Sequence, residues 1–301
     1  MQHEITAARR RQKDTELHAA AVTNQQKAHL SAIQARGATL IRSTIPTAPH
    51  LRLTNAAVSY HERMCLGLPP VLNMPLHCKC NEPNGQFASN PFHALDCIQA
   101  RGTTVTRRHD ALKYVVAKWV SDLGGVVKVE PRKLHAQGRK CRKCKTLVEC
   151  STCKRATKCT ACNNCGNCSE RRPDLLIELG GQYIAWDVTV RRACCPSHVD
   201  VASKGIEKVL EQAEREKHRA YDRLAESIGA TFVAFAVEST GGFGAEALKF
   251  VKELIALGAK VKNVWAPHEV VQGIYRSIAI AVANGNADIL EANLRDCRAW
   301  D

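Results

Sequence analysis

The stretch RRPDLLIELGGQYIAWDVTV, residues 171–190, decides how the centre of this chain folds. Residues 175–179 and 183–190 are rich in the apolar, β-branched and aromatic side chains that favour strands, and the two glycines between them are a turn signal. The stretch therefore predicts a β-hairpin. Asp174 would lie near the start of the first strand and Asp187 inside the second.

The two aspartates of this hairpin form a candidate site for a divalent metal ion. Mg²⁺ binds one or two carboxylates together with phosphate oxygens of a substrate. Asp187 stands among apolar residues, although aspartate is depleted from strands and is seldom buried without a partner. The pair therefore predicts bound Mg²⁺ or Mn²⁺. The structural alternative is a turn aspartate followed by an ordinary strand aspartate.

Length and composition limit the classes of protein to which the chain can belong. Its 301 residues suffice for one or two domains with a substantial core. No run of 18 apolar residues occurs, so we expect no transmembrane helix and no membrane partner. The N-terminus, with Arg9-Arg10-Arg11 and no apolar stretch behind it, does not have the pattern of a secretory signal.

The formal net charge is +14, and most of it is concentrated in one segment. Residues 101–172 contain eighteen lysines and arginines but only five aspartates and glutamates. Such clustering predicts a polyanionic partner, DNA or else RNA, because phosphate backbones bind clustered cations. The alternatives are a solvated basic surface and a segment whose charge is partly cancelled by metal-bound thiolates.

Fifteen cysteines in a chain without a secretory signal indicate metal binding rather than disulfides. Eight of them lie within 28 residues and repeat the C-x₂-C spacing with which two thiolates bind one ion. Apolar residues are scarce there, so metal would supply most of the folding free energy. Eight ligands suffice for two zinc ions, and an iron–sulfur cluster on the last four is the alternative. The eight residues are Cys141, Cys144, Cys150, Cys153, Cys159, Cys162, Cys165 and Cys168.

A further zinc site is predicted upstream, where Cys78 and Cys80 precede His93 and Cys97. Three thiolates and one imidazole match a closed Cys₃His zinc site, although the C-x-C spacing is tighter than the usual knuckle. His77 competes with His93 as the nitrogen ligand, and a loop with unbound cysteines is the alternative. With the eight-cysteine module, the sequence predicts about three structural zinc ions.

The chain divides into segments of different character. The cysteine module interrupts a series of elements that runs helix, strand, strand, strand, helix, strand, with further helices after it. This order predicts an α/β core with a mixed sheet and helices on its faces. The predicted segments are a polar, helical extension (1–38), a helical linker (39–75), the Cys₃His knuckle (76–100), the core (101–260) with an inserted cysteine module (139–170), and C-terminal helices (261–301). The predicted elements of the core are helix 107–123, strand 126–130, the hairpin, helix 199–228, strand 231–237 and helix 245–257.

Several short motifs follow the Cys/His knuckle in a fixed order. They are Arg108-His109-Asp110, Glu130-Pro131, Arg172-Pro173-Asp174, Asp187-Val188-Thr189-Val190 and Lys217-x₃-Tyr221. The series resembles the restriction-like endonuclease, of the PD-(D/E)XK type, at the C-terminal end of site-specific non-LTR retrotransposon proteins. The resemblance covers roughly residues 40–260. It implies a metal-dependent hydrolase that nicks target DNA so that a reverse transcriptase, in the same or a neighbouring polypeptide, can prime from the cut end. It also implies a nuclear protein in a eukaryote and an intracellular one otherwise.

The sequence departs from the usual PD-(D/E)XK pattern in two ways. Thr189 stands where a lysine would follow the second acid, and the cysteine-rich module is inserted before the hairpin. The long helix offers a replacement lysine, because Lys217 falls on its apolar stripe while Lys204 and Lys208 do not. The resemblance also favours a helix-borne lysine followed by a tyrosine, here Tyr221. A snorkelling lysine is the alternative.

The resemblance implies a role for each motif residue. Asp174 and Asp187 would hold the catalytic metal, and Lys217, with Tyr221 beside it, would orient the attacking water or offset developing charge. His109 would contact the phosphate or assist proton transfer, and Glu130 would be a third acid. Four basic residues would bind the DNA backbone, namely Arg107, Arg108, Arg171 and Arg172. Two other functions stay open, a catalytically dead, zinc-dependent nucleic-acid-binding remnant and a nuclease unrelated to transposons.

Overall fold

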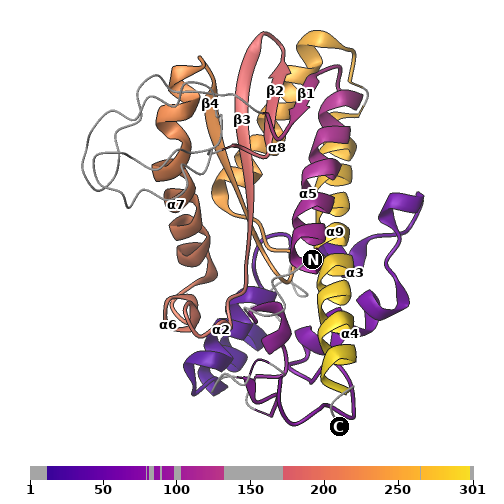
Figure 1. Ribbon diagram of the computed structural model, residues 1–301, viewed down its shortest axis with the longest axis vertical. Coiled ribbons are helices and arrows are strands. Elements are labelled where there is room, and N and C mark those ends of the chain that lie inside the picture. Colours follow the sequence, from indigo (N-terminus) through magenta and orange to yellow (C-terminus); the bar gives the residue numbers. More distant parts are fainter. Residues whose placement is uncertain are drawn as a thin grey trace, which may run out of the picture.

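The sheet at the centre of the protein has four strands in the order β1-β2-β3-β4 (Figure 1). The structure is a computed structural model that describes residues 12–78, 80, 85–88, 90–97, 103–131, 172–264 and 266–298. Neighbours β1, β2 and β3 pair antiparallel, whereas β4 runs parallel to β3, so the sheet is mixed as predicted. The strands are β1 (Val126–Val129), β2 (Leu175–Leu179), β3 (Gln182–Arg191) and β4 (Thr231–Glu238). The eight-cysteine module falls outside the described residues.

Helices precede, separate and follow the strands in the predicted order, since α5, β1, β2, β3, α7 and β4 succeed one another along the chain. Residues 12–20 are also helical. The α-helices are α2 (Asn24–Ile33), α3 (Leu40–Ser43), α4 (Asn55–Cys65), α5 (Thr103–Asp122), α6 (Val199–Ala202), α7 (Ile206–Ser227), α8 (Ala245–Val261) and α9 (Pro267–Arg298). Short 3₁₀ helices are η1 (Pro49–Leu51) and η3 (His93–Leu95). In the described part of the chain, no helix is long and apolar enough to span a membrane.

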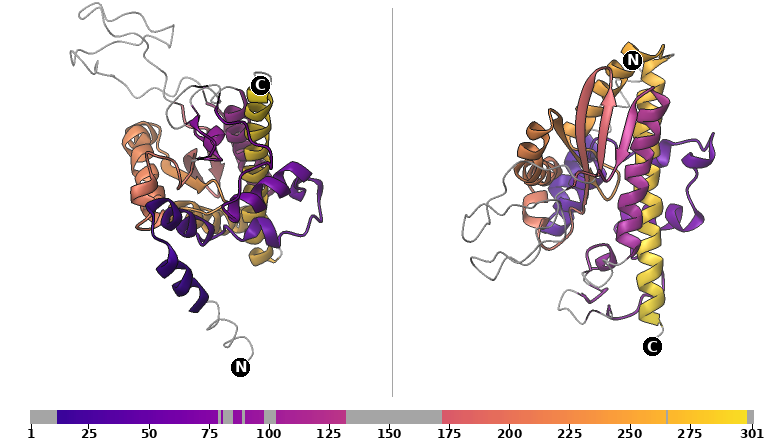
Figure 2. Two further views of the ribbon diagram at one scale, coloured as in Figure 1. Left: turned by 90° about the horizontal axis from the view of Figure 1, so that it is seen from below. Right: turned by 45° about the horizontal axis from the view of Figure 1, so that its top comes forward.

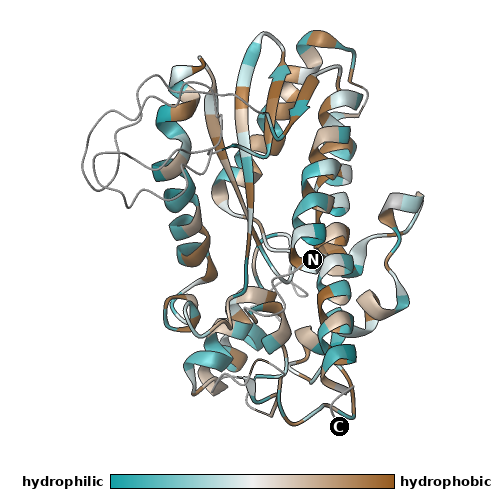
Figure 3. Cartoon of the chain, viewed as in Figure 1, coloured by the Kyte–Doolittle hydropathy of each residue, from teal (hydrophilic) through white to brown (hydrophobic). Residues whose placement is uncertain are grey.

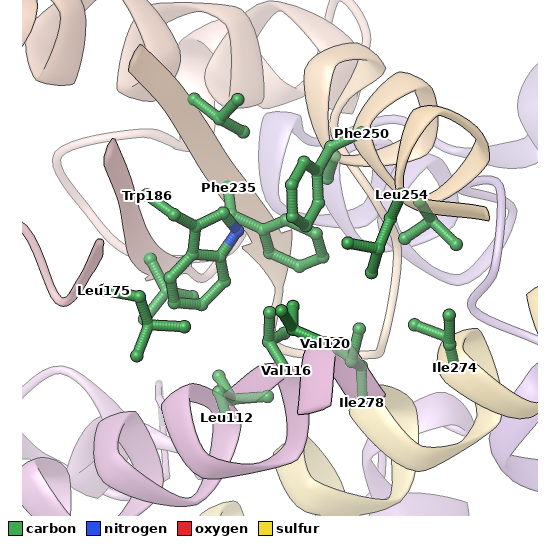
Figure 4. Packing of buried hydrophobic residues seen from close by; sticks show 14 of the residues in the cluster. Leu112, Val116, Val120, Leu175, Trp186, Phe235, Phe250, Leu254, Ile274 and Ile278 are labelled. Atoms are coloured by element: carbon green, nitrogen blue, oxygen red, sulfur yellow. The ribbon is translucent and has the colours of Figure 1, made fainter. Parts of the chain in front are cut away.

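One face of the sheet packs against α5, α8 and α9 and forms the main hydrophobic core (Figure 4). Trp186 of β3 is completely buried there, with its ring centroid 5.3 Å from that of Phe235 and 6.5 Å from that of Phe250. Alternate residues of β2, Leu175 and Ile177, point to the same face because strand side chains alternate. The burial of these large side chains supplies most of the driving force for folding.

The opposite face of the sheet is covered by α7, over its β3 and β4 half. Small side chains line this contact, with Ala185 of β3 and Ala234 and Ala236 of β4 all buried. Small residues let a helix approach a sheet closely. Figure 3 shows hydrophilic residues along much of α7, which fits a helix with one face on the sheet and the other toward solvent.

Helices from the N-terminal and C-terminal segments pack against the core elements. Helix α2 buries Ala28 and Ala32 against α6 and α7, and the Thr240 hydroxyl donates to the Ala32 carbonyl oxygen at 3.0 Å. Helix α9 runs beside α5 in every view and contributes Ile274 and Ile278 to the main core (Figures 1 and 2). The only buried side chains of α2 are alanines, so its polar sequence did not indicate this packing.

The predicted helix over residues 199–228 is two helices, because the chain turns at Gly205 between α6 and α7. Gly205 has φ 131°, a conformation that side-chain-bearing residues rarely adopt. The Ile206 N–H then donates to the Ser31 hydroxyl on α2 at 2.6 Å, so the break also fixes the start of α7. A single glycine within a helical pattern is only mildly unfavourable, so the pattern alone did not reveal the break.

Candidate active site and metal centre

The hairpin brings Asp174 and Asp187 to adjacent positions. Leu175 pairs with Trp186, and Asp174 precedes the first of these residues as Asp187 follows the second. Because Leu175 and Trp186 point into the main core, both aspartates fall on the other face of the sheet, the face that α7 covers. Their exposed fractions are 8% and 3%, so the site consists of two buried carboxylates on neighbouring strands.

Asp174 is held from two directions. Its Oδ2 atom accepts a hydrogen bond of 2.8 Å from the Val188 N–H of the neighbouring strand and lies 3.1 Å from His109 Nε2 of α5. The hydrogen bond to Asp174 raises the pKa of His109 above its ordinary value, against the opposing effect of burial. The structure thus brings His109 to the pair of aspartates, and Asp174 biases the imidazole toward its charged form.

Asp187 is bound from the other side, by α7. The Lys217 ammonium contacts Asp187 Oδ1, and the Tyr221 hydroxyl donates to the Arg172 carbonyl oxygen at 3.1 Å beside it. Burial raises the pKa of Asp187 to about 6; the charge of Asp174 acts in the same direction, while Lys217 opposes it. Burial and the charge of Asp187 also raise the pKa of Tyr221, so this tyrosine stays neutral. Lys217 therefore reaches the second acid from the helix, as its place on the stripe indicated.

The side chain of Glu130, the residue expected as a third acid, lies apart from the two aspartates. Its backbone N–H donates to the Asp174 carbonyl oxygen at 2.8 Å, but its carboxylate turns to Lys113, 2.5 Å away. Glu130 also has φ 44°, at the point where β1 ends. Within the described residues, no cluster of three carboxylates forms around Asp174 and Asp187. Proximity of backbones therefore does not bring the side chains together here.

Lys113 of α5 is a charged residue near the site that the sequence pattern did not single out. Its side chain is 1% exposed, and its ammonium lies 2.7 Å from Asp110 Oδ1 and 2.5 Å from Glu130 Oε1. Burial alone would lower the pKa of Lys113, but the two carboxylates raise it above its ordinary value, so the lysine keeps its charge. The sequence signal was a lysine directly after the buried Leu112 on an amphipathic helix.

The predicted DNA-binding arginines differ in their surroundings. Arg108 is buried, donates from Nη1 to Asn286 Oδ1 of α9 at 2.7 Å, and has its pKa lowered to about 10 by burial. Arg108, expected as a DNA contact, is thus packed in the interior beside α9. Arg107 is exposed and Arg172 is partly exposed. Arg171 lies outside the described residues.

The Cys₃His group is assembled as predicted. The ligand atoms of Cys78, Cys80, His93 and Cys97 all lie within 4.8 Å of one another. The Cys80 Sγ atom is 3.1 Å from His93 Nε2, and the Cys78 and Cys97 Sγ atoms are 3.7 Å apart. Three sulfurs and one nitrogen are ligands that suit tetrahedral Zn²⁺, so this group can hold a zinc ion. His77 instead takes part in a β-bridge with Gln86.

The surroundings of the Cys₃His group fit a bound ion. A Cβ atom on Gly85 would lie 3.1 Å from Cys80 Sγ, so only a glycine leaves this side of the group open without displacement. Burial would raise the pKa of the Cys78 thiol, but hydrogen bonds, chiefly from the Cys80 N–H and the Asn293 side chain of α9, hold it below its ordinary value. Thiolate character is what a zinc ligand requires.

No protein-family model matches this sequence, and no curated protein matches it. What the chain does is therefore inferred from the geometry of its own residues.

Proposed function

We propose that this protein is a metal-dependent endonuclease with a restriction-like, PD-(D/E)XK-type core that hydrolyses phosphodiester bonds in DNA. The observation that carries the proposal is the buried pair Asp174 and Asp187 on adjacent strands, the second in contact with Lys217. A buried aspartate pair is costly in a fold unless it binds something positive. The order of helices and strands and their mixed sheet agree with such a core.

The two carboxylates would hold Mg²⁺ or Mn²⁺, which polarises a phosphodiester and lowers the pKa of a bound water. Lys217 places its ammonium group beside Asp187, where it would offset charge that develops on the phosphate or orient the attacking water. Asp174 raises the pKa of His109, so this imidazole can exchange a proton next to the same carboxylates. Arg107 and Arg172 offer positive charge for the DNA backbone.

We further propose that cleavage serves target-primed reverse transcription in a non-LTR retrotransposon-type protein. The Cys₃His group, the helix that bears His109, the acid hairpin and the Lys217-x₃-Tyr221 pair follow one another in the order that this family has. The partners would be DNA or else RNA, and a reverse transcriptase portion in the same or a neighbouring polypeptide. Its place would be the nucleus in a eukaryote and the cell interior otherwise.

A second function, zinc-dependent nucleic-acid binding without catalysis, is favoured by one observation. Glu130, the expected third acid, is paired with Lys113, so two carboxylates alone serve a divalent ion among the described residues. A remnant of a nuclease would keep the fold, the Cys₃His group and the basic segment while losing turnover.

Plasmid nicking distinguishes the two functions. Supercoiled DNA is incubated with the zinc-loaded protein and Mg²⁺ or Mn²⁺, beside the isosteric variant Asp187→Asn. The matched control is Glu178→Gln, an exposed acid on the same sheet face of β2. The nuclease predicts open-circular product from the wild type and Glu178→Gln but not from Asp187→Asn. Product from all three would refute the assigned site, and DNA retention without any product would favour the binding remnant.

A further inference from the structure

Arg192 lies directly after β3, the strand that carries Asp187, and it is buried with 8% of its surface exposed. Its Nε atom donates to Asp96 Oδ2 at 2.5 Å, and its Nη2 atom donates to Asn90 Oδ1 at 3.0 Å and also contacts Asp96. A guanidinium with two donors on one carboxylate and a third contact on an amide is fixed in both position and orientation.

Both acceptors belong to the segment that carries two ligands of the Cys₃His group. Asp96 lies between His93 and Cys97, and the N–H groups of Asp96 and Cys97 both donate to the His93 carbonyl oxygen at 2.9 Å. The His93 N–H in turn donates to the Asn90 carbonyl oxygen at 2.9 Å. One tight turn thus holds the metal ligands and the partners of Arg192 together.

The residues on either side of Arg192 in the sequence are hydrogen-bonded to the end of β4 and the residue after it. The Arg191 carbonyl oxygen accepts from the Ser239 N–H at 2.8 Å, and the Ala193 N–H donates to Glu238 Oε1 at 3.0 Å. Asp187 lies five residues earlier on the same strand. A shift of Arg192 therefore acts on the end of β3, the strand that holds the second acid, without a flexible linker between them.

The two sides of the turn that holds the ligands are packed differently. Residues 92–95 contribute Phe92, Ala94 and Leu95 to a buried apolar cluster with Ile289 and Leu290 of α9, whereas the ligand side has only the small cluster of Phe87 and the cysteines Cys78, Cys97 and Cys297, with Met74 packed against it. Small cysteine-rich turns gain their folding free energy from metal binding. Loss of the ion would loosen Asp96 and Asn90 and leave a buried guanidinium without its carboxylate, which is strongly unfavourable.

We propose that Arg192 is a positioning residue that couples the Cys₃His metal centre to β3, so that zinc at this centre determines how firmly the strand bearing Asp187 is held. The coupling itself stands on the contacts of Arg192, and its consequence for DNA cleavage rests on the proposed function. The metal centre then acts as a support for the acid site as well as for its own loop.

Hydrogen exchange of the full-length, zinc-loaded protein tests the coupling directly. The measured peptides cover β3, with α8 as the internal reference. Cys80→Ser removes one ligand of this centre alone, and we expect it to lose one zinc ion and to exchange β3 amides at least about tenfold faster than the wild type. Arg192→Lys keeps the positive charge but loses the planar guanidinium that donates from two nitrogens. We expect this variant to retain all its zinc while its β3 amides exchange as fast as those of Cys80→Ser.

The matched control is Arg191→Lys, because Arg191 pairs with Glu216 of α7 rather than with the metal-binding segment. It should keep both its zinc and wild-type protection of β3. Asp96→Asn is the second variant should Arg192→Lys not fold, and it should behave like it. Unchanged β3 exchange in Cys80→Ser, or wild-type protection in a folded Arg192→Lys protein, would overturn the coupling.

Nicking assays on the same variants separate this inference from the proposed function. If the protein is a nuclease, Arg192→Lys should lower kcat by about tenfold or more with little change in KM for DNA, since it disturbs an acid rather than a DNA contact. If the wild type does not nick DNA, the endonuclease proposal fails, and the exchange data alone decide the coupling.

Discussion

Replacement of Asp187 by asparagine should make the zinc-loaded, Mg²⁺-free protein more stable at pH 8, although the same change should abolish the proposed nicking. Burial and Asp174 raise the pKa of Asp187 from an ordinary 3.8 to about 6. A raised folded-state pKa means that the stability this group contributes is fully present below about pH 4 and is lost as the pH rises through about 6. At pH 8 the charged carboxylate therefore opposes folding, and its isosteric amide does not.

The expected gain follows from the size of the shift. About two pKa units, at about 1.4 kcal/mol each, set an upper figure of about 3 kcal/mol, so we expect a gain of about 1–3 kcal/mol at pH 8. Lys217 loses its partner in the variant, but its side chain is 26% exposed and can turn toward water. At pH 4 the gain should nearly vanish, because both proteins are then neutral at this position.

Urea unfolding at pH 4 and pH 8, with zinc present and Mg²⁺ absent, measures the difference. Glu178→Gln is the control and should change the free energy of unfolding by less than about 0.5 kcal/mol at either pH. Added Mg²⁺ or Mn²⁺ should reduce the difference in unfolding free energy between the variant and the wild type at pH 8, since metal binding stabilises only the wild type. A variant that is less stable than the wild type at pH 8, or equally stabilised at both pH values, would refute the reasoning.

Three other substitutions test separate parts of the structure. Lys113→Met should lower the free energy of unfolding, measured in urea, by about 1–3 kcal/mol, because the carboxylates of Asp110 and Glu130 lose a buried partner. An unchanged midpoint of urea unfolding would show that these two ion pairs contribute nothing to stability. Gly205→Ala should cost about 1–2 kcal/mol by thermal unfolding, since φ 131° is strained for alanine, and Gly229→Ala, at φ 68° with open space around it, serves for comparison. If protonated His109 takes part in nicking, the wild-type rate should fall as the pH rises above the raised pKa of His109, and His109→Gln should remove this fall. An unaltered pH profile would show that the His109 proton takes no part in nicking.

Local patterns in the sequence sufficed for the elements and for part of the site. The apolar, β-branched and aromatic composition of the two strands, with the glycine pair between them, predicted the hairpin of β2 and β3. The spacing of cysteines and one histidine predicted the Cys₃His group, because its ligands come from two short segments whose geometry is set nearby. The apolar stripe of α7 indicated Lys217, because a lysine on an inward face needs an anionic partner.

Only the tertiary structure decided where side chains of distant segments meet. Arg108 and Arg107 are neighbours in a basic run, yet one is buried against α9 and the other is exposed, because their directions on α5 differ. The backbone of Glu130 is hydrogen-bonded to that of Asp174, but the Glu130 side chain pairs with Lys113. Arg192 pairs with Asp96, which lies nearly a hundred residues earlier in the sequence. Periodicity and spacing report which face of an element is buried, whereas the partner of a charged side chain depends on how whole elements pack against one another.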